Sequence, residues 1–322
     1  MRLRLLAPAA ALVVTSMLLT GCMKTDPVAN SSESEAKTVT VTSEFGKVDL
    51  PAEPKRALGM YTTDVDILIT LGFPLAEQQP IRGDGYTDFP WFFPQAELEA
   101  VKPFANYPDY NYEKILAAQP DFILNGLGYD EKVVKKLPTI APTYSVDAFD
   151  GRSWTEHFEE TAKALGRTAQ YDAWVAKYDA GVAEVKAAIG EQAKGKVVAP
   201  FGYWEGKVNS SCYSGVECQA FRDLGLTIYP GAKKKNGEGV AFSAEQVGQM
   251  SGVDVAFAIK SPGEKGQQEF DKTINQLSKN KLFADLPFMV NDKLVTYDME
   301  MTYGSPSGQM AFLDVVEEAF TQ

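Results

Sequence analysis

Histidine is almost absent from this chain of 322 residues, which contains only His157. A hydrolytic triad needs a histidine base, and a zinc or manganese site normally draws two or more histidines together with a carboxylate. His157 stands inside a predicted helix among Glu156, Glu159 and Glu160, so we expect it to be solvent-exposed. The shortage of histidine argues against a triad and against a bare metal site, and any metal would have to arrive already chelated.

Nucleophile and phosphate-binding motifs are missing as well. Residues 304–308 resemble the G-x-S-x-G turn of hydrolases, but Pro306 occupies the position of the serine. Residues 126–128 are too short for a dinucleotide or phosphate loop, no Walker sequence occurs, and Asp64 and Asp66 have no partner cluster. We therefore expect no enzymatic activity, no catalytic residue and no cofactor.

Positive charge is also scarce. The chain has 31 Lys and Arg against 43 Asp and Glu, which gives a formal net charge of -12. Binding to nucleic acid needs a dense basic face, and the only dense run, Lys233–Lys235, is expected to be a solvated loop. The charge balance therefore argues against nucleic acid as a partner.

Long apolar runs are missing after the first residues, so we expect no later segment to span a bilayer. Met1–Arg4 is positive and Leu5–Leu18 is apolar but short, which is the pattern of an export signal. The following Leu-x-Gly-Cys resembles the lipobox of bacterial lipoproteins. It predicts a signal peptide over residues 1–21, lipid on Cys22 and a flexible tether over residues 22–37, on the extracytoplasmic face of the bacterial cell membrane. The alternative is an ordinary secretory signal that ends at a cysteine by chance.

Cysteine is rare too, with three residues in the chain. If Cys22 carries lipid, Cys212 and Cys218 remain in an exported protein, where oxidation is expected. We predict that these two form a disulfide that fixes local shape. The alternative, two free thiols, is disfavoured by an oxidising compartment.

What the chain does contain is one long amphipathic helix near its middle, residues 168–189, whose apolar side chains recur at helical spacing up to Gly190. Segments of similar size lie on both sides, and each alternates short apolar strands with helices. The sequence therefore predicts an α/β fold: two Rossmann-like lobes, residues 38–167 and 191–322, joined by a connecting helix over 168–190, with a ligand cleft between the lobes.

Several local elements are also predicted. We expect a hairpin that pairs 38–42 with 47–50, a strand at 139–141, and helices over 244–250 and 273–285. The segment 113–123 matches 245–256, with one Glu near the start of each equivalent helix, which suggests two similar halves. Chance similarity between α/β units is the alternative.

Aromatic side chains stand in the loops after the predicted strands, where α/β sheets bind ligands. Any single ring is better explained by core packing, so the argument depends on the cluster. Arg82, Arg152 and Arg222 are candidates to meet acidic oxygens. The predicted ligand-binding residues are Tyr61, Arg82, Tyr86, Trp91, Phe92, Tyr129, Tyr203, Trp204, Tyr213, Arg222 and Tyr303.

With these features together, the chain from Arg56 onward resembles the class III substrate-binding proteins of ABC importers for ferric siderophores, haem and vitamin B12. The most specific segments are Asn111–Ile115 with Gln119–Ile123, and Phe242–Val247 with Asp254-Val255. The closing run near Leu282–Pro287 also matches, although it lacks the family's Trp. The resemblance implies that Glu113 and Glu245 dock onto arginines of the importer's membrane subunits. Stabilisation of their own helix dipoles is the alternative role.

The resemblance implies a ferric siderophore as ligand and a monomer that delivers it to an ABC permease. The acidic balance of the chain favours a hydroxamate or mixed type over a highly anionic tris-catecholate. A haem carrier is the alternative within the family, because Tyr129 could serve as an axial ligand, and nothing favours cobalamin. A lipid-anchored extracellular hydrolase is the rival from another class. We expect substitution of Trp91 or Trp204 by Ala to weaken ligand binding.

Overall fold

The computed structural model describes residues 37–213 and 215–322. The predicted signal peptide, the predicted lipidation site Cys22 and nearly all of the predicted tether lie outside the described residues. In the part of the chain that the structure describes, no helix combines the length and apolar character needed to cross a membrane.

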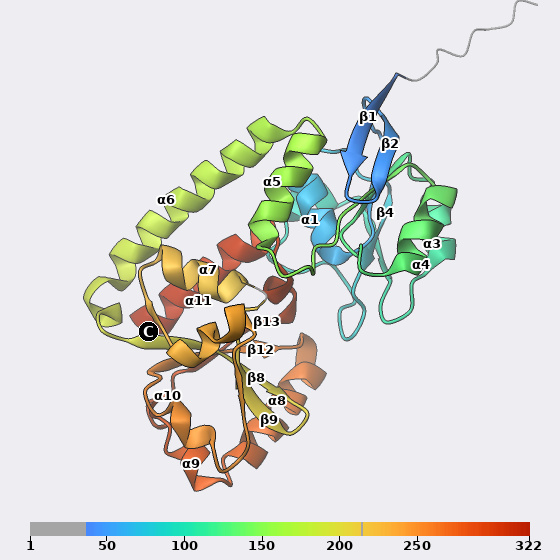
Figure 1. Ribbon diagram of the computed structural model, residues 1–322. Coiled ribbons are helices and arrows are strands. Elements are labelled where there is room, and N and C mark those ends of the chain that lie inside the picture. Colours follow the sequence, from blue (N-terminus) through green and yellow to red (C-terminus); the bar gives the residue numbers. More distant parts are fainter. Residues whose placement is uncertain (1–36, 214) are drawn as a thin grey trace, which may run out of the picture. The chain divides into compact units, whose positions relative to one another are not determined.

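The first described element is a hairpin of two antiparallel strands, β1 (Thr38–Ser43) and β2 (Gly46–Pro51) (Figure 1). The register pairs Val41 with Val48, so the predicted hairpin is confirmed. Its turn carries Glu44, whose side chain reaches residues that lie about a hundred positions further along the chain.

The segment before the long helix contains two small parallel sheets. The first has the order β3 (Ala57–Gly59), β6 (Phe122–Asn125) and β7 (Thr143–Ser145), and the second pairs β4 (Gln78–Ile81) with β5 (Lys102–Ala105). The helices between these strands are α1 (Thr62–Thr70), α2 (Gln95–Leu98), α3 (Tyr112–Ala117), α4 (Glu131–Lys136), the 3-10 turn η1 (Leu137–Thr139) and α5 (Trp154–Ala164).

The segment after the long helix folds around one mixed sheet of order β11-β9-β8-β12-β13, with β10 paired to β8. The strands are β8 (Val197–Trp204), β9 (Lys207–Ser210), β10 (Thr227–Ile228), β11 (Val240–Phe242), β12 (Val255–Lys260) and β13 (Leu294–Asp298). The helical elements are α7 (Val216–Asp223), η2 (Pro230–Lys233), η3 (Lys235–Gly237), η4 (Val247–Met250), α8 (Gly263–Leu277), α9 (Lys281–Ala284), α10 (Pro287–Val290), η5 (Met299–Tyr303) and α11 (Pro306–Thr321).

The faces of this mixed sheet bury different side chains, as the two-residue period of a strand requires. Phe257 on β12 packs with Phe221 of α7 and Phe312 of α11. Ala256 and Ala258, which point the other way, belong to the cluster that contains residues of α9 and α10. Helices therefore cover both faces, as in a Rossmann-like lobe.

The long helix α6 runs from Thr168 to Ala193, with a non-helical backbone at Gly190, where the sequence predicts its end. Trp174, on its buried face, donates a hydrogen bond from its indole nitrogen to the carbonyl of Pro306 at 3.1 Å. Tyr178 stacks on Trp174 and donates to Asp223. The helix contacts α1 and α5 of the segment before it and α11 of the segment after it, so it joins the two predicted lobes (Figure 1). We retain the lobe boundaries 38–167, 168–190 and 191–322 as a proposal.

Three local predictions are wrong. Residues 139–141 are not a strand, because prolines at 138 and 142 favour a 3-10 turn followed by a strand at 143–145. The expected helix over 244–250 is only the 3-10 turn η4, after bonds from the amides of Gln246 and Val247 to the Ser243 carbonyl. The expected helix over 273–285 is two helices, because Asn280 caps the start of α9.

Candidate functional site

The loops that follow the parallel strands β7 and β13, one from each lobe, lie at one cleft. The loop after the antiparallel strand β9 joins them there. A cavity of about 250 Å³ at this place is lined by loop residues after β7, after β9 and after β13, on both sides of α6 in the sequence. Its lining residues are Ala148, Phe149, Gly151, Arg152, Trp154, Tyr213, Thr302 and Tyr303.

Aromatic rings form the two sides of this cleft. On the N-terminal side, Tyr129 and Phe149 pack edge to face with centroids 5.4 Å apart and stay 57% and 38% exposed. On the C-terminal side, Tyr303 lies 6.5 Å from Phe149, and the Tyr213 hydroxyl donates to the Phe149 carbonyl at 3.4 Å. We call Tyr129 and Phe149 the N-terminal wall, and Tyr213 and Tyr303 the C-terminal wall.

Arg82, which directly follows β4, lies below the rings and is 5% exposed. Its guanidinium carbon is 4.1 Å from the centre of the Tyr303 ring, 5.1 Å from that of Tyr61 and 5.0 Å from that of Tyr107, which is cation–π geometry. The same guanidinium forms a buried ion pair with Glu300 of η5. Burial opposes the charge, but Glu300 and Tyr303 together outweigh burial and raise the pKa of Arg82. The predicted binding arginine is therefore already paired.

Tyr86 connects the two lobes below the cleft. Its hydroxyl donates to the carboxylate of Asp298, at the end of β13, and accepts a bond from the Glu300 amide at 3.1 Å. Burial and the neighbouring Asp298 raise the pKa of Tyr86. Since Tyr86 is only 8% exposed, we infer that it links the two lobes and does not contact the ligand.

The expectation that His157 is exposed is wrong, because it is 3% exposed. It shares the buried face of α5 with Trp154 and Thr161. Side chains of the preceding loop lie within hydrogen-bond distance of both its ring nitrogens. Its Nε2 lies 3.0 Å from an Asp150 oxygen and its Nδ1 lies 3.4 Å from Arg152. Hydrogen bonds from Arg152 and His157 lower the pKa of Asp150 to about 2, against a partial burial that opposes them.

The loop that carries Phe149 is held by this charged network. Arg152 pairs with Asp150 of the same loop, with Glu160 of α5 and with Glu44 of the β1–β2 turn. Glu44 also accepts the Asp147 amide at 2.8 Å. The ligand atoms of Glu44, Asp150 and His157 lie close enough together for a metal ion, but the Arg152 guanidinium bonds to both carboxylates and fills that place.

Two buried carboxylates stabilise the backbone around the cleft. Asp64 accepts the amides of Tyr61 and Gly126, both at 3.1 Å, and its burial raises its pKa to about 7. Asp66 accepts the amide and the hydroxyl of Ser307, both at 2.7 Å, and burial raises its pKa to about 6. Asp64 thus holds strand-end loops together, and Asp66 ties α1 to the start of α11.

The other predicted residues lie elsewhere. Tyr203 and Trp204 line a groove of about 520 Å³ between β8, β12 and α8. Trp91 and Phe92 line a separate groove of about 590 Å³ against α6 and α11. Arg222 is exposed on α7, and no contact in the described part of the chain brings it to the cleft rings. The structure therefore brings together Tyr61, Arg82, Tyr86, Tyr129, Tyr213 and Tyr303, and leaves the rest apart.

Sequence reasoning missed Phe149 and Tyr107. Phe149 follows β7 by four residues, so a correct placement of that strand would have found it by the strand-end rule. Tyr107 follows β5 by two residues, and the same rule would have found it had β5 been predicted.

The two predicted docking glutamates are exposed. Glu113 lies in the first turn of α3, and Glu245 lies in the turn before η4, where it accepts the Ser243 hydroxyl at 2.6 Å. This bond from Ser243 lowers the pKa of Glu245. Both side chains are thus available to a partner.

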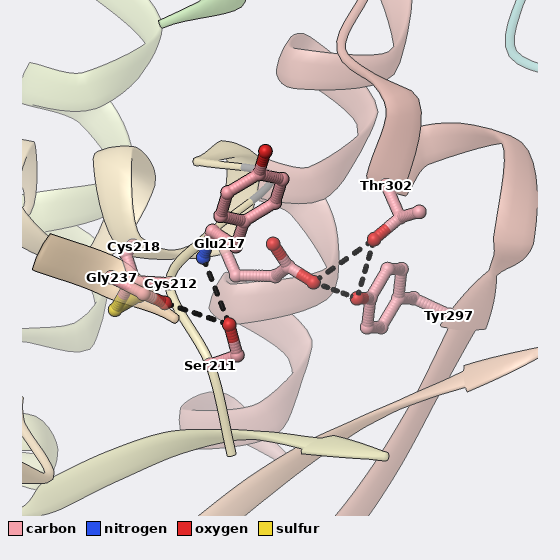
Figure 2. Close-up of a disulfide and its surroundings, with 8 residues drawn as sticks. Ser211, Cys212, Glu217, Cys218, Gly237, Tyr297 and Thr302 are labelled. Atoms are coloured by element: carbon pink, nitrogen blue, oxygen red, sulfur yellow. Dashed lines mark hydrogen bonds between the residues drawn. A yellow bond between two sulfur atoms is a disulfide. The ribbon is translucent and has the colours of Figure 1, made fainter. Parts of the chain in front are cut away.

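The predicted disulfide between Cys212 and Cys218 is confirmed, with Cα atoms 5.5 Å apart (Figure 2). It joins the chain just after β9 to the first half of α7. The neighbouring Ser211 hydroxyl donates to the Gly237 carbonyl at 2.7 Å.

Comparison with known proteins agrees with this architecture. The family model described as "Periplasmic binding protein" matches residues 60–301. A Bacillus subtilis protein named "Probable siderophore-binding lipoprotein YfiY" is 29% identical over 154 residues, which are 47% of this chain and 46% of that protein, so the match spans about half of the relative's length.

Solved structures share the fold over nearly their whole length. Staphylococcus aureus SirA, complexed with staphyloferrin B, has a TM-score of 0.68 at 21% identity, covering 88% of this chain and 98% of that one. A FhuD fold-family component of a Fep/Fec-like ferrichrome ABC transporter from Bacillus subtilis has a TM-score of 0.65 at 22% identity, covering 87% and 99%. Since the family model covers most of this chain, the chain belongs to the periplasmic binding protein family.

Proposed function

We propose that the protein is an extracytoplasmic substrate-binding protein that captures a ferric siderophore and delivers it to an ABC importer for iron uptake. The observation that carries this is the aromatic cleft, whose two walls come from segments on either side of α6. Rigid rings with few polar groups suit a large, preassembled organic iron complex. The names of the relatives, a siderophore-binding lipoprotein and two siderophore-transport proteins, support the same ligand class.

Charge at the cleft favours a ferric complex without net negative charge. Arg82 is paired with Glu300, and Arg152 is paired with Glu44, Asp150 and Glu160. An anionic tris-catecholate would have to compete with carboxylates for both cations. A hydroxamate or mixed siderophore, whose deprotonated groups balance Fe³⁺ more closely, carries no such requirement.

Delivery uses the exposed glutamates. Glu113 and Glu245 stand one on each lobe, and we propose that they pair with arginines of the permease. Lipid on Cys22 would hold the monomeric protein at the membrane, on the extracytoplasmic face. The protein acts as a carrier and catalyses no reaction.

Haem is the second candidate. The Tyr129 side chain is 57% exposed at the cleft and Tyr213 is 51% exposed, so each offers a hydroxyl that could become an axial ligand. A haem complex would show a Soret band whose position depends on that tyrosine.

The experiment titrates purified protein, followed by tryptophan fluorescence, with ferrichrome, ferric staphyloferrin B and a ferric tris-catecholate, and in parallel with haem, followed by absorbance. We expect saturable quenching by ferrichrome, weaker quenching by the two more anionic complexes and no haem spectrum. Saturable haem binding without response to any ferric siderophore would overturn the proposal in favour of the haem carrier.

A further inference from the structure

Glu217 is a carboxylate buried behind the C-terminal wall. It lies in α7 next to Cys218, is 4% exposed, and points away from the disulfide toward Tyr297 and Thr302 (Figure 2). Its Oε1 accepts bonds from the Tyr297 hydroxyl and from the Thr302 hydroxyl, the latter at 3.1 Å. Burial raises the pKa of Glu217 against these bonds. A buried carboxylate is unfavourable unless its oxygens accept hydrogen bonds, so these two hydroxyl donors stabilise Glu217 in its place.

Both partners frame η5, the segment that carries Tyr303 into the cleft. Tyr297 lies one residue before the end of β13, and Thr302 immediately precedes Tyr303. On its other side η5 is held by the N-terminal lobe, because Glu300 pairs with Arg82. Glu217 therefore supplies a buried anchor of η5 within its own lobe.

The position of Glu217 is itself fixed. The disulfide joins Cys218 to Cys212, just after β9, and the Cys212 amide donates to the Ala232 carbonyl at 3.1 Å. At the first residue of α7, the carbonyl of Val216 accepts a hydrogen bond from the side-chain amide of Gln309 at 3.2 Å. The first turns of α7 are thus tied to β9 and to α11, so the backbone that carries Glu217 is held by elements other than η5.

We propose that Glu217 is a positioning residue of the ligand site: clamped by the disulfide, its carboxylate holds Thr302 and the end of β13, and so fixes the Tyr303 ring opposite Phe149. This inference rests on the proposed function, since it assigns the residue to the cleft where the ferric complex binds. Glu217 touches no ligand and acts through Thr302.

The test compares Glu217→Leu with Glu217→Gln, using ferrichrome titrated into the full-length protein and followed by tryptophan fluorescence. The Leu variant removes the acceptor, and we expect ferrichrome affinity to fall about tenfold, the effect of losing a bond to a charged group. The Gln variant keeps an acceptor oxygen, and we expect its affinity within about threefold of the parent. Tyr297→Phe removes one of the two hydroxyl donors to Glu217. Its affinity should fall between those of the two Glu217 variants, which keeps the test decisive if the Leu variant does not fold.

Phe221→Leu is the matched control, because Phe221 lies in the same helix but packs on Phe257 and Phe312. It should lower the unfolding temperature and leave ferrichrome affinity unchanged. The positioning role is wrong if Phe221→Leu weakens ferrichrome binding as much as Glu217→Leu does at an equal loss of stability. It is also wrong if the folded Glu217 and Tyr297 variants bind ferrichrome like the parent. If the parent itself binds no ferric complex, the proposed function fails, which is a different outcome.

Discussion

The two walls of the cleft carry the same kind of side chain but are held in different ways. Phe149 sits on a loop fixed by ion pairs around Arg152, whose side chain is 35% exposed. Tyr303 follows Thr302, which is fixed by the buried Glu217 and, through α7, by a disulfide. Partly exposed ion pairs weaken with salt, whereas buried hydrogen bonds and a covalent bond do not. The N-terminal wall is therefore the adaptable side, and the C-terminal wall is the fixed side.

The largest expected effect concerns the exposed glutamates Glu113 and Glu245, one on each lobe, rather than the two walls of the cleft. Glu113→Ala combined with Glu245→Ala should abolish iron uptake in cells and leave ferrichrome affinity intact, because both side chains are exposed and lie outside the cleft lining. Each single variant tells whether one lobe docks more strongly. Glu131→Ala, an exposed first-turn glutamate of α4, is the control and should transport normally. Normal transport by the double variant would refute the docking role.

The next effect concerns Asp64, the buried carboxylate that holds the strand-end loops of the N-terminal lobe. Its pKa rises from 3.8 to about 7 on folding, so the folded state binds the proton more tightly. This contribution to stability is complete below about pH 4 and is lost as pH rises through 7, a change of about 4 kcal/mol. In Asp64→Asn, the free energy of unfolding from denaturant titrations should lose this pH dependence. The exposed Asp109→Asn should keep it, and an unchanged slope in Asp64→Asn would contradict the assignment.

A smaller effect tests the covalent clamp of the C-terminal wall. The ring closed by Cys212 and Cys218 is short, and the chain-entropy model gives about 2 kcal/mol for a loop of this size. Double substitution of Cys212 and Cys218 by Ser should lower the free energy of unfolding by about this amount. It should also weaken ferrichrome binding more than a variant that loosens the N-terminal wall does. A double variant with unchanged stability and affinity would show that the clamp is dispensable.

The smallest effect probes the adaptable wall. Glu44→Gln removes one ion pair to Arg152, and ferrichrome affinity should fall about threefold at low salt, with the difference from the parent disappearing at high salt. Glu159→Gln, which breaks an exposed pair with Lys163 in α5, should change nothing. A salt-independent loss in Glu44→Gln would mean that both walls are equally fixed.

The features that the sequence predicts well are those with a local cause. The connecting helix follows from the spacing of Trp174, Tyr178 and Val185, and all three are buried. The strand-end rule finds Tyr61 and Tyr303, because parallel strands must end at the same edge.

The features that it predicts poorly depend on partners far away in the chain. His157 is buried because Asp150 and Arg152 satisfy its ring, and helical periodicity contains no information on that loop. Glu217 looks like an ordinary surface glutamate until Tyr297, 80 residues later, is placed beside it. Trp91 lies against α6 and α11 in a groove of its own, so we now expect Trp91→Ala to leave ligand binding unchanged.

The central claim is that a ferric siderophore lodges between the two walls, and one measurement tests it most directly: ferrichrome affinity, by fluorescence titration, of the double variant Phe149→Ala with Tyr303→Ala against that of Trp91→Ala. Truncating two rings that face the ligand should weaken binding by at least about tenfold, while Trp91→Ala should bind like the parent. Parent-like affinity in the double variant, with a loss in Trp91→Ala, would place the ligand in the groove beside α6 and α11 and contradict this account.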